Sequence, residues 1–115
     1  MELYEIIKLQ TQFDEAHGWE IPPLKSKAFI ESLSDDVLGL IGEVGEFANI
    51  AKKIKLDLKT LNEDSTDKYL GAMKEECIDM FIYFIRISAH IGIDIEKEYL
   101  KKLSINEKRF TKYEK

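Results

Sequence analysis

The stretch LGLIGEVGEFANIAKK, Leu38–Lys53, decides the fold of this chain. Its apolar residues recur at spacings of three and four, which is typical of one face of a helix; they are Leu40, Ile41, Val44, Phe47, Ala48 and Ala51. Glu43 and Glu46 lie three residues apart, so a helix presents both at the edge of that face. The stretch also holds three glycines, and each costs about 1 kcal/mol relative to alanine. We therefore expect a backbone or a ligand close by; tight helix packing beside solvated glutamates is the alternative.

A second stretch, CIDMFIYFIRISA at Cys77–Ala89, is apolar almost all round and predicts a buried helix. Asp79 lies within it, and an ionised aspartate in such surroundings needs a partner charge, a dense set of hydrogen bonds or a metal ion. Glu76 precedes Asp79 by three residues and shares its helical face. The alternative is that Asp79 pairs with a lysine or with Arg86, although Arg86 lies two helical turns away.

Two helices thus each present a pair of carboxylates, Glu43 with Glu46 and Glu76 with Asp79. Four converging carboxylates would raise one another's pKa values unless cations neutralised them. Ligation by oxygen alone favours Mg²⁺ or Mn²⁺ over zinc. A di-iron bundle would need a histidine three residues after a glutamate, and neither histidine of this chain has one. The pattern therefore predicts a site for Mg²⁺ or Mn²⁺ between two helices.

The whole chain of 115 residues is the size of one domain. With 44% hydrophobic residues, 34% charged residues and few glycines or prolines, it reads as helix-rich and globular. Periodicity and capping residues predict an all-α fold of four helices with the third one central. The expected helices run from Leu3 to about His17, from Ser34 to about Lys55, from Thr66 to about Ile91, and from Asp94, its cap, to about Phe110. An irregular loop is expected between the first two helices, and the apolar residues of the last helix are expected to face the core.

The formal charge of −5 disfavours a broad electrostatic surface for nucleic acid or anionic membranes. A phosphate-bearing ligand would then need a local basic cluster or a bound cation, and the last helix is the basic part of the chain. The single cysteine excludes an intramolecular disulfide, and no apolar run reaches the roughly 18–20 residues that cross a bilayer. We expect a cytoplasmic protein without a nucleic-acid or membrane partner.

Three motifs carry a resemblance to a known family. GEVGEFANIAKK (Gly42–Lys53), EECIDMFIYF (Glu75–Phe84) and KLSINEKRF (Lys102–Phe110) resemble the MazG-like branch of the all-α nucleoside triphosphate pyrophosphohydrolases. That branch includes dimeric dUTPases and dCTP pyrophosphatases. The resemblance implies that residues 1–115 form a single MazG-like domain, a four-helix bundle assembled as a homodimer or homotetramer whose sites combine helices from more than one subunit.

The resemblance also implies an activity. It is the Mg²⁺-dependent cleavage of a (d)NTP between the α and β phosphates, which yields the monophosphate and pyrophosphate and suits a role in cleaning the nucleotide pool. Mg²⁺, with Mn²⁺ as a substitute, would be held by Glu43, Glu46, Glu76 and Asp79. Glu43 or Glu46 would also orient or deprotonate the attacking water, so no protein nucleophile is needed.

Five residues match substrate contacts of the family. Trp19 would stack on the base, Tyr83 would lie near the sugar, and Lys53, Asn106 and Arg109 would contact phosphate and sugar. Each has a plainer interpretation as a solvated surface residue or a packing residue. His17 stands where relatives often have arginine, which leaves the preferred base open. The other functional hypothesis is a non-catalytic helical oligomer that binds nucleotide or a protein partner.

Overall fold

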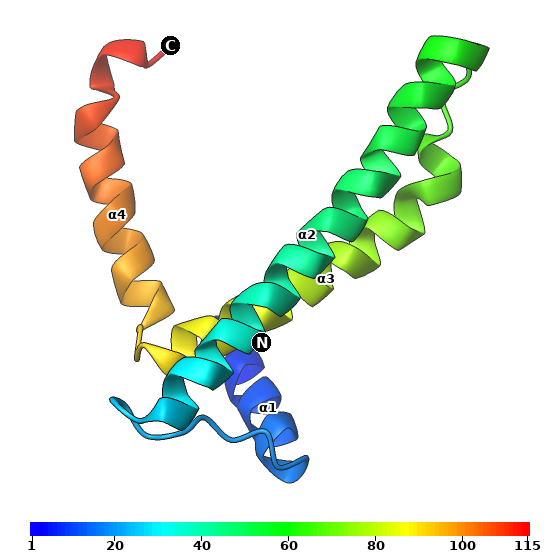
Figure 1. Ribbon diagram of the computed structural model, residues 1–115. Coiled ribbons are helices and arrows are strands. Elements are labelled where there is room, and N and C mark those ends of the chain that lie inside the picture. Colours follow the sequence, from blue (N-terminus) through cyan, green and yellow to red (C-terminus); the bar gives the residue numbers. More distant parts are fainter.

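The computed structural model describes residues 1–115 and contains helices only. The all-α class and the four predicted helices are confirmed (Figure 1). In chain order the elements are α1 (Leu3–Ala16), α2 (Lys27–Leu61), α3 (Thr66–His90), α4 (Ile95–Arg109) and a short 3-10 turn, η1 (Thr111–Tyr113).

Helix α2 is much longer than its sequence pattern indicated. The prediction that it starts at Ser34 is wrong, because Ser26 caps it eight residues earlier: the Ser26 hydroxyl accepts a hydrogen bond from the backbone N–H of Phe29 at 3.0 Å. The predicted end at Lys55 is also too early. No residue breaks the helix before Asn62, which takes up the left-handed conformation at φ 53°.

Helices α2 and α3 form a long antiparallel hairpin, and α1 packs against α3 at the open end of that hairpin (Figure 1). Because α3 contacts both α1 and α2, its predicted central position is confirmed. It is not buried on every side, however, since Ile78 and Phe84 are exposed. At its end Gly92 adopts a positive φ of 69°, which fits the predicted stop.

Helix α4 begins where its cap was predicted, with the Asp94 carboxylate accepting a hydrogen bond from the backbone N–H of Lys97 at 3.2 Å. The prediction that its apolar face packs on the core of the same chain is wrong. Tyr99, Leu100, Leu103 and Phe110 are all exposed, because α4 extends away from the other helices (Figure 1). The radius of gyration is accordingly 18.2 Å, against roughly 13 Å for a compact chain of this length.

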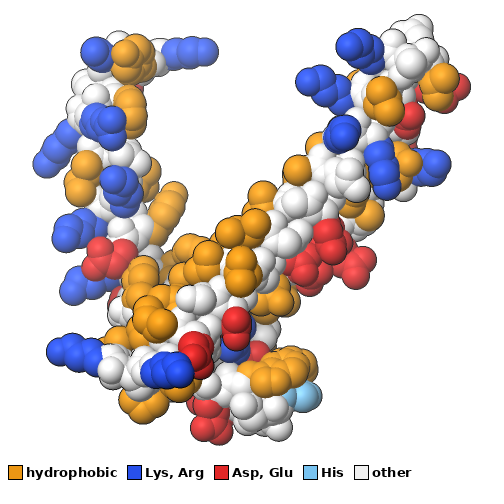
Figure 2. All heavy atoms as spheres, in the orientation of Figure 1, with side chains coloured by type: hydrophobic (Ala, Val, Ile, Leu, Met, Phe, Trp, Pro, Cys, Tyr) orange, Lys and Arg blue, Asp and Glu red, His pale blue; other side chains and the backbone are white.

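The chain buries little apolar surface by itself. Only three apolar side chains are buried, those of Phe29, Ile54 and Ile85. Many large apolar side chains are exposed instead, and Figure 2 shows a band of them along the side of α2 that faces the gap toward α4. None of the helices combines the length and the hydropathy that a membrane span requires.

Candidate metal centre and adjoining cavity

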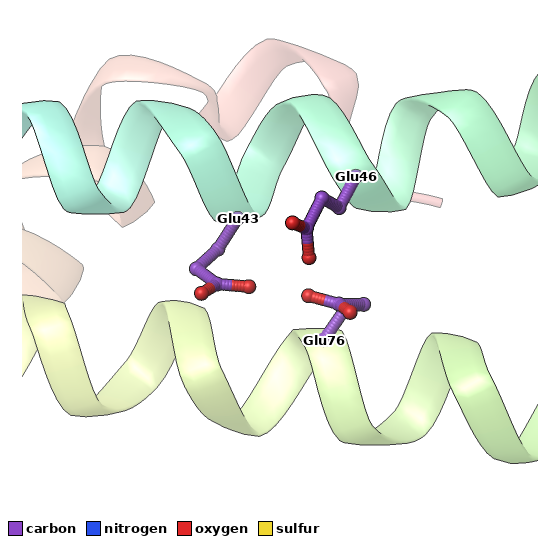
Figure 3. Close-up of side chains that lie close together, drawn as sticks. All are labelled: Glu43, Glu46 and Glu76. Atoms are coloured by element: carbon purple, nitrogen blue, oxygen red, sulfur yellow. The ribbon is translucent and has the colours of Figure 1, made fainter.

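Three carboxylates meet between α2 and α3. Glu43 and Glu46 reach from α2 toward Glu76 on α3 (Figure 3), and an oxygen from each lies within 4.8 Å of the other two. Glu43 and Glu46 point the same way because they lie three residues apart on one helix. Glu76 meets them because α3 runs antiparallel along the same face of α2.

The cluster carries negative charge without a compensating cation. No lysine, arginine or histidine forms an ion pair with any of the three glutamates. A hydrogen bond with Glu43, partial desolvation, and the neighbouring Glu46 together raise the pKa of Glu76 to about 8. A proton therefore substitutes for the missing positive charge at neutral pH.

These residues fit a hard divalent cation. The Oε2 atoms of Glu43 and Glu76 are buried and lack a hydrogen-bond partner, and a buried acceptor without a partner is costly. Carboxylate oxygens at this separation are the ligands that Mg²⁺ and Mn²⁺ prefer. The cluster thus contains three of the four predicted metal ligands.

Asp79, the fourth predicted ligand, lies one turn beyond Glu76 on α3. It is outside the three-carboxylate group, but it lines the same cavity as Glu43. The alternative pairing of Asp79 with Arg86 is wrong, because Arg86 binds Asp14 and Asp36 instead. Asp79 therefore remains free to face a ligand in the cavity.

The cavity next to the cluster is an open cleft with a volume of about 730 Å³, lined by residues of α1, the α1–α2 loop, α2 and α3. Glu43 and Asp79 contribute carboxylates to the lining of the cavity, and Trp19 and Tyr83 contribute aromatic surface. Gly39 on α2 makes room for Tyr83, because a Cβ at this position would overlap the tyrosine ring. The close approach expected at the three glycines is found at Gly39 alone, where a side chain makes it; a Cβ at Gly42 or Gly45 would meet nothing within 4 Å.

An aromatic cluster forms one wall of this cavity. The Phe13 and His17 rings lie 4.2 Å apart between centroids, and the His17 and Trp19 rings are stacked at 5.1 Å. Phe13 and Trp19 line the cavity although each is about half exposed. Planar rings with free faces are suited to stack on another planar ring.

Three of the predicted substrate-binding residues lie away from the cavity of their own chain. Lys53 is exposed two turns beyond Glu46, roughly 10 Å farther along α2. Asn106 and Arg109 lie on α4, which leads away from the site (Figure 1). The Arg109 guanidinium instead lies 5.0 Å from the centre of the Phe110 ring.

Sequence reasoning missed the ionic group formed by Asp14, Asp36 and Arg86, which lines the cavity beside the aromatic wall. Asp36 was interpreted as a residue of the first helical turn, whereas it lies inside α2 and is buried. The available signal was Arg86 itself, a cation within the most apolar stretch of the chain, because such a charge needs a carboxylate from another element.

Comparison with curated proteins finds distant relatives. The chain is 27% identical over 108 residues to dCTP pyrophosphatase 1 of Homo sapiens, and 26% identical to dCTP pyrophosphatase 1 of Rattus norvegicus and of Mus musculus. Each match covers 94% of this chain and 58% of the relative, so the chain spans somewhat more than half the length of these proteins. No family model and no solved structure matches the chain.

The fold and the site define an all-helical protein with a carboxylate cluster between two antiparallel helices and an aromatic cavity beside it. With the distant relatives, these features confirm the resemblance seen in the sequence motifs. The chain is a distant relative of the dCTP pyrophosphatases, one of the groups that the resemblance had pointed to.

Proposed function

We propose that the protein is a Mg²⁺-dependent nucleoside triphosphate pyrophosphohydrolase. It would cleave a (d)NTP between the α and β phosphates and release the monophosphate and pyrophosphate. One observation carries the proposal: Glu43 belongs both to the uncompensated carboxylate cluster and to the aromatic cavity. A ligand with a planar base in the cavity would therefore place its phosphates next to the cluster.

Glu43, Glu46, Glu76 and Asp79 are the residues that would hold Mg²⁺, with Mn²⁺ as a substitute. The bound ion would neutralise phosphate charge and activate water, which is the chemistry that phosphoanhydride cleavage requires. Glu43 or Glu46 would accept the proton of the attacking water. Glu76 must first release the proton that it holds with Glu43, so cation binding and deprotonation of the cluster are coupled.

The base would lie against Trp19, with Tyr83 near the sugar. Both side chains line the cavity, and stacking alone does not distinguish one base from another. The relatives are named for dCTP, so cytosine nucleotides are the first substrates to test. Cleaning of the nucleotide pool is the role that this activity would serve.

We propose further that the active unit is a homodimer or homotetramer in the cytoplasm. The apolar side chains along α2 and α4 are exposed in one chain, and contiguous exposed apolar surface is typical of protein interfaces. Lys53, Asn106 and Arg109 are remote from the cavity of their own chain. They would contact the substrate across such an interface. Sedimentation equilibrium measures the assembly directly, and a monomer at micromolar concentration would contradict it.

A panel of standard and damaged (d)NTPs, incubated with Mg²⁺ or with EDTA, tests the activity. We expect metal-dependent release of pyrophosphate, with dCTP among the substrates. Orthophosphate as the product, or no metal-dependent turnover of any nucleotide, would sink the proposal. Quenching of Trp19 fluorescence by nucleotides without any turnover would favour the non-catalytic nucleotide-binding oligomer instead.

A further inference from the structure

The Arg86 side chain joins three parts of the molecule that border the cavity. Its Nε donates to Asp36 Oδ1 on α2 at 2.9 Å, and its Nη1 lies 2.9 Å from Asp14 Oδ2 on α1. The same Nη1 donates to the backbone carbonyl of Trp19, in the α1–α2 loop, at 3.2 Å. One guanidinium therefore ties α3 to α2, to α1 and to the loop.

This network is shielded from water and retains its charges. The side chains of Arg86, Asp14 and Asp36 are only 13%, 10% and 9% exposed. Burial alone would lower the pKa of Arg86, but its hydrogen bonds and charge interactions with Asp36 and Asp14 outweigh burial and raise that pKa. An ionic contact in such a dry position is far more sensitive to loss of one partner than a surface pair is.

The half of the network on α2 and α3 forms a fixed frame. His90 Nδ1 donates to the Arg86 backbone carbonyl at 2.8 Å and lies 3.5 Å from Asp36 Oδ2. Its Nε2 is hydrogen-bonded to Ser32 Oγ at 3.0 Å. Together with the long contact between the two helices, these bonds tie α2 to α3 around Asp36 and Arg86 without using α1.

The other half of the network, on α1 and the α1–α2 loop, holds the aromatic wall, which is largely exposed. Gln10 donates to Asp14 Oδ1 at 2.9 Å, and the Asp14 backbone carbonyl accepts from the Trp19 N–H at 2.8 Å. Asp14 therefore links the guanidinium to the aromatic wall. The wall itself is 52% exposed at Phe13 and 53% exposed at Trp19, so apolar burial contributes little to fixing its orientation.

We propose that Arg86 is a positioning residue which, through Asp14 and the Trp19 carbonyl, sets the orientation of the aromatic wall relative to the carboxylates of α2 and α3. It would thereby control how a nucleobase fits the cavity, while the metal ligands remain in place. The role assigned to the cavity rests on the proposed function, whereas the structural coupling of Arg86 to Trp19 does not. A purely structural role for Arg86 would change stability without changing the environment of Trp19 in the folded protein.

Trp19 is the only tryptophan of the chain, so tryptophan fluorescence, excited selectively over the tyrosines, reports on the wall alone. We expect Asp14→Asn to shift the emission to the red and to increase quenching by acrylamide. Glu15→Gln is the matched control, because it makes the same change one residue away on an exposed side chain without an ion pair. It is expected to leave both readings unchanged. Far-UV circular dichroism checks that each variant is folded.

Arg86→Lys provides the second variant, because lysine keeps the charge but lacks the planar fork that reaches Asp36, Asp14 and the Trp19 carbonyl together. It should reproduce the change in Trp19 fluorescence. If Arg86→Lys does not fold, Asp14→Asn alone decides the question. Unchanged emission and quenching in the folded variants would overturn the proposal, whether or not any nucleotide is hydrolysed.

The kinetic readout applies once wild-type turnover is established. We expect Asp14→Asn to raise KM about tenfold, the equivalent of one weakened charge-assisted hydrogen bond, with kcat nearly unchanged. A loss confined to kcat would contradict a role in fitting the base. If the wild-type protein hydrolyses no nucleotide, the proposed function fails, and the fluorescence result still decides whether Arg86 positions the wall.

Discussion

Two groups of carboxylates lie on or against the α2–α3 hairpin, and only one of them has its own cation. Asp14 and Asp36 share the Arg86 guanidinium and are nearly buried. Glu43, Glu46 and Glu76 have no basic partner, and two of their oxygens are buried without a hydrogen bond. Asp36 Oδ2 is also buried without a hydrogen bond, but His90 Nδ1 lies 3.5 Å away. The first group therefore has basic partners within the folded chain, whereas the second requires a proton or an external cation. Uncompensated charge of this kind is typical of functional sites.

The spacing of residues on the two helices explains why the groups differ. Asp36 and Glu43 lie seven positions apart on α2, and Asp79 and Arg86 lie seven positions apart on α3. Because the helices run antiparallel, α3 places arginine opposite Asp36 and acidic residues opposite Glu43 and Glu46. The two groups therefore lie roughly 10 Å apart along the hairpin and can be perturbed separately.

The largest effect on stability is expected from Arg86→Met. It leaves Asp14 and Asp36 as neighbouring buried carboxylates without a cation, and should lower the free energy of unfolding by about 3–5 kcal/mol. Urea denaturation measures the loss. Lys27→Met is the control, because its ion pair with Glu31 is exposed at 3.8 Å and contributes about 0.5 kcal/mol at most. Similar losses in both variants would mean that the Arg86 network is not the dry ionic contact described above.

Glu43→Ala should have the largest effect on activity. Mutation of a residue that only supports a metal ligand typically lowers activity or metal affinity 10–100-fold. Loss of a direct ligand should therefore lower kcat/KM by at least about 10²-fold. Asp79→Ala should likewise abolish turnover, and the helix content by far-UV circular dichroism should remain nearly intact in both variants. Glu31→Ala, an exposed glutamate on the same helix, is the control that should keep activity. Unfolding caused by Asp79→Ala would point to a structural role for this residue.

Two glycine substitutions test the helix between the groups. Gly42→Ala introduces a Cβ that meets nothing within 4 Å, so better helix propensity should stabilise the protein by about 0.5–1 kcal/mol. Gly39→Ala overlaps the Tyr83 ring and should be less stable than Gly42→Ala by about 1 kcal/mol or more. Thermal and urea unfolding measure the difference. Equal stability would show that Tyr83 moves aside freely, and a raised KM in Gly39→Ala alone would then locate Tyr83 beside the substrate.

The remaining effect is a pH dependence that involves one proton. The folded, metal-free protein holds a proton on Glu76 up to about pH 8, whereas the ordinary value for this group is 4.5. Between these values the folded state binds more protons than the unfolded chain, so the free energy of unfolding falls as pH rises. Glu76→Gln should remove this slope in EDTA and abolish stabilisation by Mg²⁺.

Glu75→Gln provides the control for the pH experiment, because it changes an exposed neighbour on the same helix. Urea midpoints of the three proteins at about pH 5 and about pH 8 would show the slope in wild type and in Glu75→Gln only. A slope that persists in Glu76→Gln would assign the proton to another group.

What the sequence by itself determined is local. Apolar periodicity placed the helices, and the pairs Glu43 with Glu46 and Glu76 with Asp79 followed from the three-residue spacing that puts side chains on one helical face. Asp94 and Gly92 marked helix ends for similarly local reasons. The cap at Ser26 was missed, because two prolines just before it suggested a longer loop than the chain forms.

Only the tertiary structure decided which charges meet. Arg86 binds a carboxylate 50 residues away and a carbonyl 67 residues away, and no helical spacing relates such distant positions. The same holds for α4, whose amphipathic pattern predicted a packed face that its own chain does not cover. Periodicity in the sequence shows which face of a helix is apolar. The register and path of the whole helices determine which residues lie against that face. For this protein, that register leaves Glu43, Glu46 and Glu76 without a cation.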